Sequence, residues 1–355
     1  MIWYLLLAAC PFVVAPIVNT YYKSSIIKND KAKKTFLFWC GLALFLMISL
    51  RHYSVGSTDS MNYYNNWLEM QRISFGQLKN QLINSEMEPG YLTVVWALSK
   101  VFRDAQFLFV FTGGFFSFSV CRFIYKNSED PTLSFVMYIT LSLFTFMIQA
   151  LRQAIAMCIC LFAIEFCKKR KIIPFILLVL LAMSFHTSAI AFIPVYFLGL
   201  IPLKMSTYAA AFAVSGALLA FSGPLINYAN EWYGSEYYRV VDSGGFIALA
   251  VYILILLVAF LYQDKCRDKK LFDFFFLLTF FGATVYSMRY IGGLIAGRMS
   301  NYYMFGQVIL LPNIIGRMER QTKIIVYMIT LALCILLFAY RLSTSDLIPF
   351  MFYWQ

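Results

Sequence analysis

The stretch LRQAIAMCICLFAIEFCKKRK, residues 151–171, decides the fold. Its middle is an apolar run of helical length, with Arg152 near one end and the four basic residues 168–171 at the other. A membrane-spanning helix needs about 20 predominantly apolar residues, and Lys and Arg gather in the loops on the cytoplasmic side. The stretch therefore predicts a membrane-spanning helix that ends in the cytoplasm, with Arg152 on the opposite face of the membrane.

The composition of the whole chain agrees with this interpretation. The chain has 355 residues, of which 61% are hydrophobic and 13% are charged, whereas soluble proteins average about 45–50% apolar and about 25% charged. A water-soluble core of this size cannot hide the excess, so the lipid bilayer is the expected solvent. The net charge of +12 does not indicate nucleic-acid binding, because the basic residues lie in short loops between apolar runs.

We predict an all-α polytopic membrane protein with about twelve transmembrane helices, forming one integral membrane domain over residues 1–355. The apolar segments that support it are 2–19, 35–50, 105–121, 132–149, 153–167, 172–186, 188–203, 205–221, 245–262, 272–288, 299–316 and 323–340. Because no basic residues precede the first segment, it is expected to be a retained span and not a cleaved signal peptide.

The basic loops set the predicted orientation. Most of the 29 Lys and Arg residues fall in the cytoplasm if both termini lie outside. The apolar segment 89–102 is too short to span, and a crossing there would turn loop 168–171 outward. We therefore expect 89–102 to be re-entrant or interfacial. Two long outer loops result, 51–104 and 222–244, and the second carries aromatic residues at 232, 233, 237 and 238.

Metal and disulfide chemistry are not expected. The chain has eight cysteines without a CxxC spacing, and only two histidines, His52 and His186. The cysteines lie mostly in apolar runs, where cysteine behaves as a small hydrophobe. The sequence has no cluster of metal-ligating residues and no DxD motif, which argues against a metal-dependent sugar-nucleotide enzyme. We predict no metal and no cofactor.

Arginines that topology disfavours are the first sign of a site. Arg51, Arg152, Arg289 and Arg298 lie at span ends or in tight outer loops. The planar guanidinium donates two parallel hydrogen bonds to a phosphate, so the four together favour an anion site. The alternative for each single arginine is that its side chain snorkels to lipid headgroups.

Neighbours of these arginines extend the predicted anion site. Gln153 adds a donor beside Arg152 at the start of a helix. Tyr302 lies four residues after Arg298, so the two share a helix face. The turn between Arg289 and Arg298 contains glycines at 292, 293 and 297, which permit a close approach of the backbone to a ligand.

Three residues are candidates for a general base, and the sequence does not rank them: Asp59, Glu88 and His186. The alternative for Glu88 is a carboxylate at a helix N-terminus, followed by Pro89 in the first turn. A single histidine at a membrane edge is more often a hydrogen-bonded polar residue than a catalyst. The tyrosines and tryptophan of the outer loop at 63, 64 and 67 are suited to stacking on sugars, or to an aromatic belt at the interface.

These motifs together resemble the EpsG/Wzy family of polysaccharide polymerases. The resemblance covers about residues 35–310 and rests on five short motifs that occur in order on the predicted outer face. They are Arg51 through Asp59 with Tyr63, Glu88-Pro89-Gly90-Tyr91, Leu151-Arg152-Gln153, Phe185-His186-Thr187-Ser188, and Arg298 with Tyr302.

The resemblance implies a GT-C-like architecture, a substrate and a place of action. The expected substrate is undecaprenyl diphosphate carrying an oligosaccharide repeat unit. The expected reaction transfers the growing glycan to a new lipid-linked unit on the periplasmic or extracellular side of the cytoplasmic (inner) membrane. A flippase and a chain-length regulator are the expected partners. In this interpretation Arg152, Arg289 and Arg298 stabilise the leaving diphosphate, and Arg51 helps to bind a donor or acceptor diphosphate.

Three other functions stay open from the sequence. A flippase or transporter for the same lipid-linked sugars also needs a cationic cavity, but its expected marks are repeats and mid-membrane polar residues. An O-antigen ligase shares the donor chemistry and differs only in the acceptor. A membrane acyltransferase centred on His186 is the third.

Overall fold

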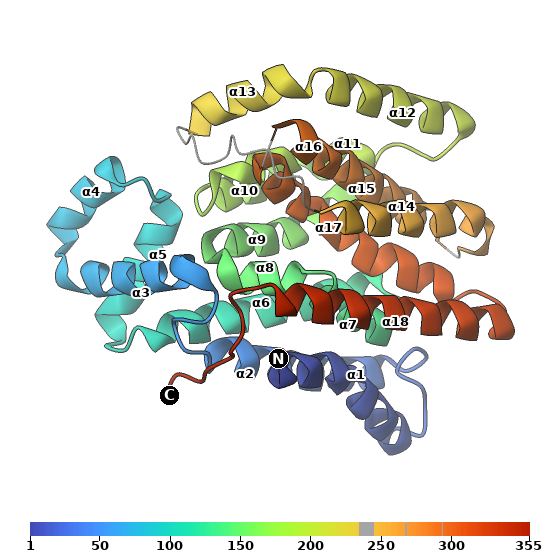
Figure 1. Ribbon diagram of the computed structural model, residues 1–355, viewed down its shortest axis with the longest axis horizontal. Coiled ribbons are helices and arrows are strands. Elements are labelled where there is room, and N and C mark those ends of the chain that lie inside the picture. The colour runs from blue at the N-terminus through green and yellow to red at the C-terminus, as the bar shows by residue number, and fades with distance from the viewer. Residues whose placement is uncertain (234–244, 267, 293) are drawn as a thin grey trace.

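The computed structural model describes residues 1–233, 245–266, 268–292 and 294–355. The regular secondary structure of these residues is helical, apart from one antiparallel bridge between Arg51 and Phe352. The helices form a bundle whose members run roughly parallel and antiparallel, with a smaller group of helices at one end (Figure 1).

The bundle contains most of the apolar segments that the sequence predicts. Its elements are α1 (Ile2–Tyr21), α2 (Asp30–Ser49), α6 (Gln106–Asn127), α7 (Pro131–Thr140), α8 (Leu143–Gln149), α9 (Leu151–Lys168), α10 (Ile172–Met183), η1 (Thr187–Phe192), α11 (Val195–Leu198), α12 (Met205–Ala220), α14 (Phe246–Leu261), α15 (Lys269–Ser287), α17 (Leu294–Ile315) and α18 (Arg320–Ser343). Shorter pieces are α13 (Ser222–Tyr233), η3 (Gln263–Lys265) and α16 (Arg289–Gly292).

The predicted count of about twelve spans needs a correction. Five described helices, α1, α2, α6, α15 and α18, are long and apolar enough to cross a membrane, and a sixth span results if the pair α7 and α8, bent by 51°, is one broken crossing. Helices α10, α12 and α14 are apolar but shorter. The chain is thus a multi-pass membrane protein with five or six spans by length and composition, plus shorter apolar helices.

Two segments show why the count differs. The segment predicted at 188–203 folds as the 3₁₀ helix η1 and the one-turn helix α11, since Pro194 and Pro202 remove backbone donors within it. The segment predicted at 132–149 breaks at Ser142, which adopts a left-handed φ of 74°. Apolarity alone predicts neither interruption.

The basic loops meet at one end of the bundle. Lys33 of α2 donates to the carbonyl of Ser128 at 2.6 Å, and Lys168 of α9 donates to Asn127 at 2.6 Å. Arg317, after α17, pairs with Glu129 at 2.5 Å, and Lys265 lies 3.8 Å from Glu319. The loops after α1, α6, α9, α14 and α17 therefore lie on the same side, as the positive-inside rule requires.

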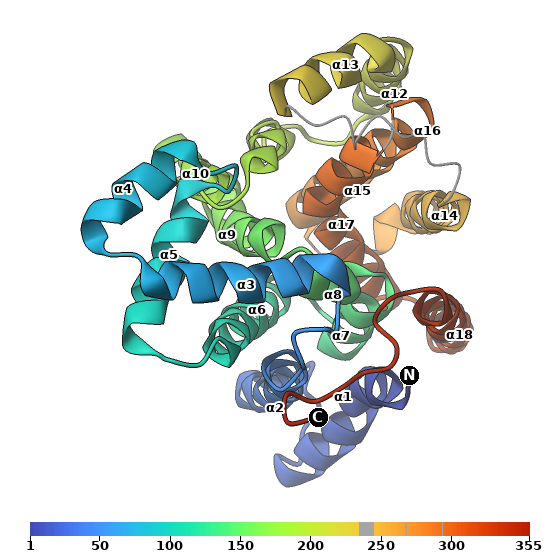
Figure 2. The same ribbon diagram turned by 60° about the vertical axis from the view of Figure 1, so that its left-hand side comes forward.

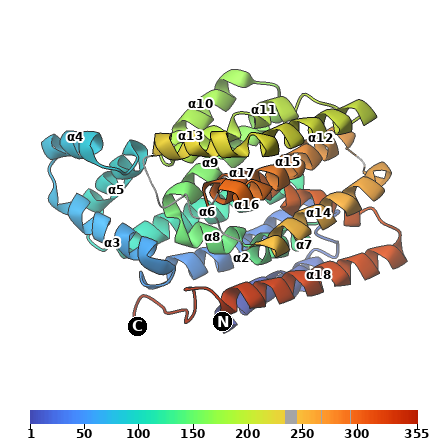
Figure 3. The same ribbon diagram turned by 45° about the horizontal axis from the view of Figure 1, so that its top comes forward.

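The first outer segment folds into a cap of three helices, α3 (Ser57–Arg72), α4 (Phe75–Asn84) and α5 (Pro89–Val101). The cap projects beyond the opposite end of the bundle (Figures 1 and 3). Helix α5 has 13 residues, about 20 Å at 1.5 Å per residue, which is too short to cross the hydrocarbon. Its packing against α3 and α4 fits the interfacial placement that the sequence predicts.

Both chain ends lie at the end of the bundle that carries the cap. The C-terminal tail crosses beside the loop after α2, where His52 N donates to Met351 O and Tyr353 N to Leu50 O, each at 2.9 Å. The Tyr4 hydroxyl near the start of α1 donates to Leu347 O at 3.1 Å. Figure 2 shows the two termini close together below α3. The chain thus crosses the bundle an even number of times.

We predict that the cap end and the basic end lie on opposite sides of the membrane. In a Cys266→Ser background, a cysteine in place of the exposed Asn84 should react with a membrane-impermeant maleimide in intact cells. A cysteine in place of the exposed Lys171 should react only after the membrane is opened. The Cys266→Ser chain without added cysteine is the control. Labelling of both positions in intact cells would contradict the predicted orientation.

Candidate functional site

A cluster of polar side chains lies where the cap meets the bundle. We call it the cap cluster and define it as Glu88, Arg152, Gln153, His186, Thr187, Ser188, Arg298 and Tyr302. Its members come from the N-terminus of α5, the first turn of α9, the start of η1 and the first turns of α17. The five predicted motifs lie far apart in the sequence, and four of them contribute the residues of the cap cluster.

Glu88 and Arg152 form the central contact of the cap cluster. One Arg152 guanidinium nitrogen donates to Glu88 Oε2 in an ion pair whose side chains are 25% and 11% exposed. The other carboxylate oxygen, Glu88 Oε1, accepts from the backbone N–H and the hydroxyl of Thr187, each at 3.2 Å. Both oxygens of the carboxylate are thus occupied, and the pair connects α5, α9 and η1.

The close approach of α5 to the end of α10 sets the position of Glu88. Gly90 N donates to Ser184 O at 2.7 Å. A Cβ on Gly90 would lie 2.3 Å from Ser184 Oγ and 2.7 Å from Ser184 O, distances at which atoms overlap. Glycine is therefore required at this position, which gives a physical reason for the Glu-Pro-Gly-Tyr order.

His186 caps η1 and is buried, with 5% of its surface exposed. Its Nδ1 accepts from Ser188 N at 3.3 Å and lies 2.7 Å from Ser188 Oγ, and that hydroxyl lies 3.0 Å from the Tyr302 hydroxyl. Burial, together with the positive charges of Arg152 and Arg298, lowers the pKa of His186 to about 3. The imidazole is therefore neutral at pH 7, and with Nδ1 accepting, its proton is on Nε2.

Arg298 enters the cap cluster from α17. Its charge acts on His186, as does that of Arg152, so both guanidinium groups lie near one imidazole. The backbone carbonyl of Arg298 accepts from Gln153 Nε2 at 2.7 Å, which fixes the start of α17 against α9. Gln153 is 1% exposed and therefore holds the helices together, while Arg152 and Arg298 are both half-buried.

The remaining predicted residues have different surroundings. Arg51 is fully buried, donates to Val55 O at 2.6 Å and Ser60 Oγ at 3.1 Å, and stacks 4.4 Å from the Phe109 ring. Burial lowers the pKa of Arg51 to about 10, so it stays charged at neutral pH. In this structure Arg51 supports the loop before α3, where Gly56 takes a left-handed φ of 109°.

Asp59 and Tyr63 bring α3 to the cap cluster. They lie one helical turn apart, and the Tyr63 hydroxyl interacts electrostatically with both Asp59 and Arg152. Burial raises the pKa of Tyr63, so the phenol is protonated. Asp59 is half-exposed, and within the described ranges no cation forms an ion pair with it.

Arg289 lies on α16, beside the start of α17. Its Nη1 donates to the Tyr286 hydroxyl at 3.2 Å, and a Cβ on Gly297 would lie 3.4 Å from Arg289 Cδ. The guanidinium therefore lies near the residue before Arg298. Gly293 and residues 234–244 of the second predicted outer loop, including the tyrosines at 237 and 238, lie outside the described residues.

Sequence reasoning missed the roles of Thr187 and Ser188. Both belong to a quoted motif, but their partners, Glu88 and Tyr302, are about 100 residues away in the chain. No local signal indicates such contacts. As for metals, no group of three or more His, Cys, Asp or Glu side chains is arranged to hold an ion in the part of the chain that the structure describes.

Comparison with known proteins gives one result. The model of the EpsG family matches residues 6–354, nearly the whole chain, and the resemblance seen in the sequence motifs is confirmed over a longer range. No curated protein and no solved structure matches the chain.

We predict that His186 makes the fold sensitive to acid. Its pKa is lower in the folded chain than the usual 6.5, so the unfolded chain binds more protons between these values. The stabilisation is complete above pH 6.5 and is lost as the pH falls, by at most about 1.4 kcal/mol per pH unit. Thermal unfolding of purified protein at pH 7.5 and pH 5 measures the loss.

His186→Asn is the matched variant, because asparagine keeps an acceptor at the start of η1 and does not titrate. Its melting temperature should fall less between pH 7.5 and pH 5 than that of the wild type. If the melting temperatures of both proteins fell equally between pH 7.5 and pH 5, this would contradict a buried, neutral His186.

Proposed function

Since the chain belongs to the EpsG family, which is linked to exopolysaccharide synthesis, we propose that it is a polymerase of undecaprenyl-diphosphate-linked oligosaccharide repeat units. It acts on the outer face of the cytoplasmic membrane, in the synthesis of an O-antigen, a capsule or an exopolysaccharide. The growing glycan moves from its lipid carrier to a new lipid-linked unit, and undecaprenyl diphosphate leaves.

One observation carries the proposal: Arg152 and Arg298 approach the same buried imidazole, at the end of the bundle opposite the basic loops. A lipid diphosphate keeps its charge at the membrane surface, within reach of helix ends. Guanidinium groups held in place before the reaction stabilise charge that develops on a leaving phosphate. The cap cluster offers such groups without a metal ion.

The proposed reaction is a single displacement at a sugar carbon. A hydroxyl oxygen of the acceptor sugar forms a bond to the anomeric carbon of the donor glycan. The bond from that carbon to the phosphate oxygen breaks, and the diphosphate takes the electron pair. The hydroxyl proton passes to a general base. Arg152 and Arg298 bind the diphosphate, and Arg289 is placed to contact it beside the start of α17.

Asp59 is the base that the geometry favours. Both oxygens of Glu88 are occupied by Arg152 and Thr187. His186 is neutral, and with a pKa of about 3 it is a weak base at pH 7. Asp59 is half-exposed on the side of α3 that carries Tyr63, and therefore remains open to an acceptor hydroxyl.

The other members of the cap cluster position these groups. Glu88 orients the guanidinium of Arg152, Gln153 holds the backbone of Arg298, and Ser188 links His186 to Tyr302. The exposed basic loops face the cytoplasm in this proposal, so the cap cluster faces outward. A flippase that delivers lipid-linked units and a chain-length regulator are the proposed partners.

We predict that Arg152→Gln and Arg298→Gln each reduce polymer synthesis by about 10²–10³-fold, the usual cost of removing one donor to a developing charge. Purified protein in detergent, supplied with lipid-linked repeat units and EDTA, provides the assay, with products resolved on a gel. Arg103→Gln, at an exposed arginine next to the cap, is the matched control and should keep wild-type activity.

Two results would count against the assignment. Near-normal chain length in both the Arg152 and Arg298 variants would exclude the diphosphate role. No polymer from the wild-type protein, together with movement of lipid-linked units across vesicle membranes, would identify a transporter.

We predict that Asp59→Asn reduces the rate of polymer formation by about 10²–10⁴-fold, the usual contribution of a general base. Because Asp59 does not bind the diphosphate in this proposal, retention of undecaprenyl diphosphate by the purified variant should be unchanged. Glu88→Gln is the comparison, since its loss disturbs Arg152 and should weaken that retention. An active Asp59→Asn protein would exclude Asp59 as the base.

A further inference from the structure

A groove runs along the lipid-facing side of α2 and α6, at a distance from the cap cluster. It encloses about 450 Å³ and is lined mainly by apolar side chains. Phe38 and Phe118 on its walls are 63% and 61% exposed. Such exposure on a membrane helix means contact with lipid, since water is absent from the bilayer core.

Two glycines create the groove. A Cβ on Gly41 would lie 2.9 Å from Cys121 Sγ, so glycine lets α2 and α6 approach closely at this point. The Cys121 thiol donates to Leu37 O at 3.4 Å across the same contact. A Cβ on Gly114 would meet only the Phe45 ring, at 3.8 Å, so the space above Gly114 is open.

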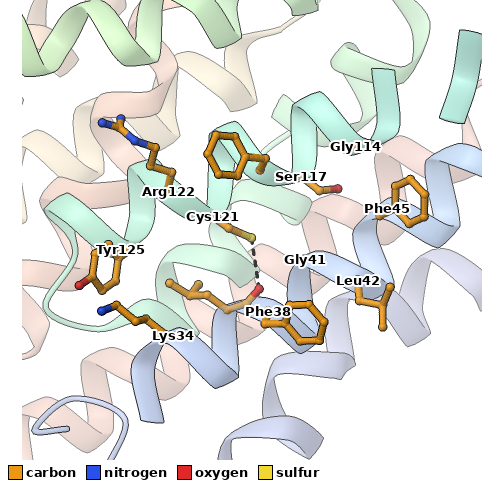
Figure 4. Close-up of a pocket in the computed structure, with 12 residues that line it drawn as sticks. Lys34, Phe38, Gly41, Leu42, Phe45, Gly114, Ser117, Cys121, Arg122 and Tyr125 are labelled. Atoms are coloured by element: carbon orange, nitrogen blue, oxygen red, sulfur yellow. Dashed lines mark hydrogen bonds between the residues drawn. The ribbon is translucent and has the colours of Figure 1, made fainter. Parts of the chain in front are cut away.

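The groove is charged at one end only. Figure 4 shows Lys34, Arg122 and Tyr125 together at one end and Leu42, Phe45 and Gly114 toward the other. Lys34 Nζ lies 5.4 Å from the Tyr125 ring centre, and the Arg122 guanidinium lies 4.9 Å from that of Phe162. Lys33 and Lys126 also lie within 5.5 Å of the Tyr125 ring.

Few acidic groups oppose these cations. Lys34 pairs with Asp30 at 2.7 Å, but both side chains are about 60% exposed, and exposed pairs of this kind are weak. Across the described ranges, no carboxylate forms an ion pair with Arg122. The end of the groove therefore keeps positive charge to offer to an anion.

The length of the groove corresponds to one leaflet. From Lys34 to Phe45 the helix rises about 17 Å at 1.5 Å per residue, about half of a hydrocarbon core of roughly 30 Å. The charged end lies beside the basic loops, where Lys33 donates to Ser128 O. A lipid carrier whose diphosphate is held at the cap does not fit this groove, because its charge would lie at the end of the bundle opposite Lys34 and Arg122.

We propose that the groove between α2 and α6 binds one anionic phospholipid of the cytoplasmic leaflet, with its phosphate between Lys34 and Arg122 and an acyl chain along Phe38 toward Gly114. Basic residues at the cytoplasmic ends of spans bind such headgroups. This proposal depends on the proposed function only for the orientation of the protein in the membrane. Its test measures lipid retention without any polymerisation substrate, so the two proposals can fail independently.

Native mass spectrometry of purified protein tests the proposal. The protein is titrated in detergent with equal amounts of phosphatidylglycerol and phosphatidylcholine, and the bound lipids are counted by mass. The wild type should retain phosphatidylglycerol in preference. Lys34→Gln with Arg122→Gln should reduce the preference by about fivefold for each cation removed. Lys31→Gln with Arg320→Gln, which removes two exposed cations at the same end, is the matched control and should leave the preference unchanged.

A third variant separates the groove from the charges. Gly114→Leu fills the open space and should reduce retention of both lipids, with the protein still eluting as a folded species with unchanged helical content. Equal retention of the two lipids by the wild type would overturn the proposal, as would equal losses in the Lys34/Arg122 variant and its control. A two-chain mass that becomes one chain in Gly114→Leu would assign the groove to a second copy instead, and would also overturn it.

Discussion

The ion pair between Arg152 and Glu88 is the contact on which the cap cluster depends, because it joins the helix bundle to the cap. Arg152 begins α9, Glu88 precedes α5, and the second carboxylate oxygen reaches η1 through Thr187. An ion pair that is mostly removed from water needs further hydrogen bonds to offset its desolvation, and Thr187 provides them. Removing Glu88 would leave a largely buried guanidinium without its counter-charge and would release three elements from one another.

The two ends of the bundle use positive charge in different ways. At one end, Lys33, Lys168 and Arg317 contact Ser128, Asn127 and Glu129, respectively, in the loop after α6. At the other end, Arg152 and Arg298 approach a neutral histidine whose low pKa follows from burial and from the two cations themselves. Because His186 stays neutral, it does not add a third positive charge beside the two guanidinium groups. The lysine-rich end of the bundle indicates the cytoplasmic side. The end that carries Arg152 and Arg298 is suited to binding an anion.

Helix positions were predictable from the sequence because they depend on local apolarity. Segments such as 105–121 and 153–167 became α6 and α9 with boundaries shifted by a few residues. The break at Ser142 depends on a left-handed residue, and the start of η1 depends on the cap by His186, and apolarity indicates neither. The prolines at 194 and 202, which interrupt the same segment, are visible in the sequence. Residues of the five motifs lie near one another in the structure. The pairing of Glu88 with Arg152 and the burial of Arg51 beneath the C-terminal tail depend on contacts between distant parts of the chain. Long-range contacts of this kind leave no periodic signal in a single sequence.

The central claim is that guanidinium groups at the cap end hold a lipid diphosphate. An electron cryomicroscopy structure of the protein with undecaprenyl diphosphate tests it most directly. The account predicts that the two phosphates lie within hydrogen-bonding distance of Arg152 and Arg298, with the prenyl chain descending from the cap end into the bilayer. Phosphates bound at the end of the bundle that carries residues 168–171, or beyond hydrogen-bonding distance of both arginines, would contradict it.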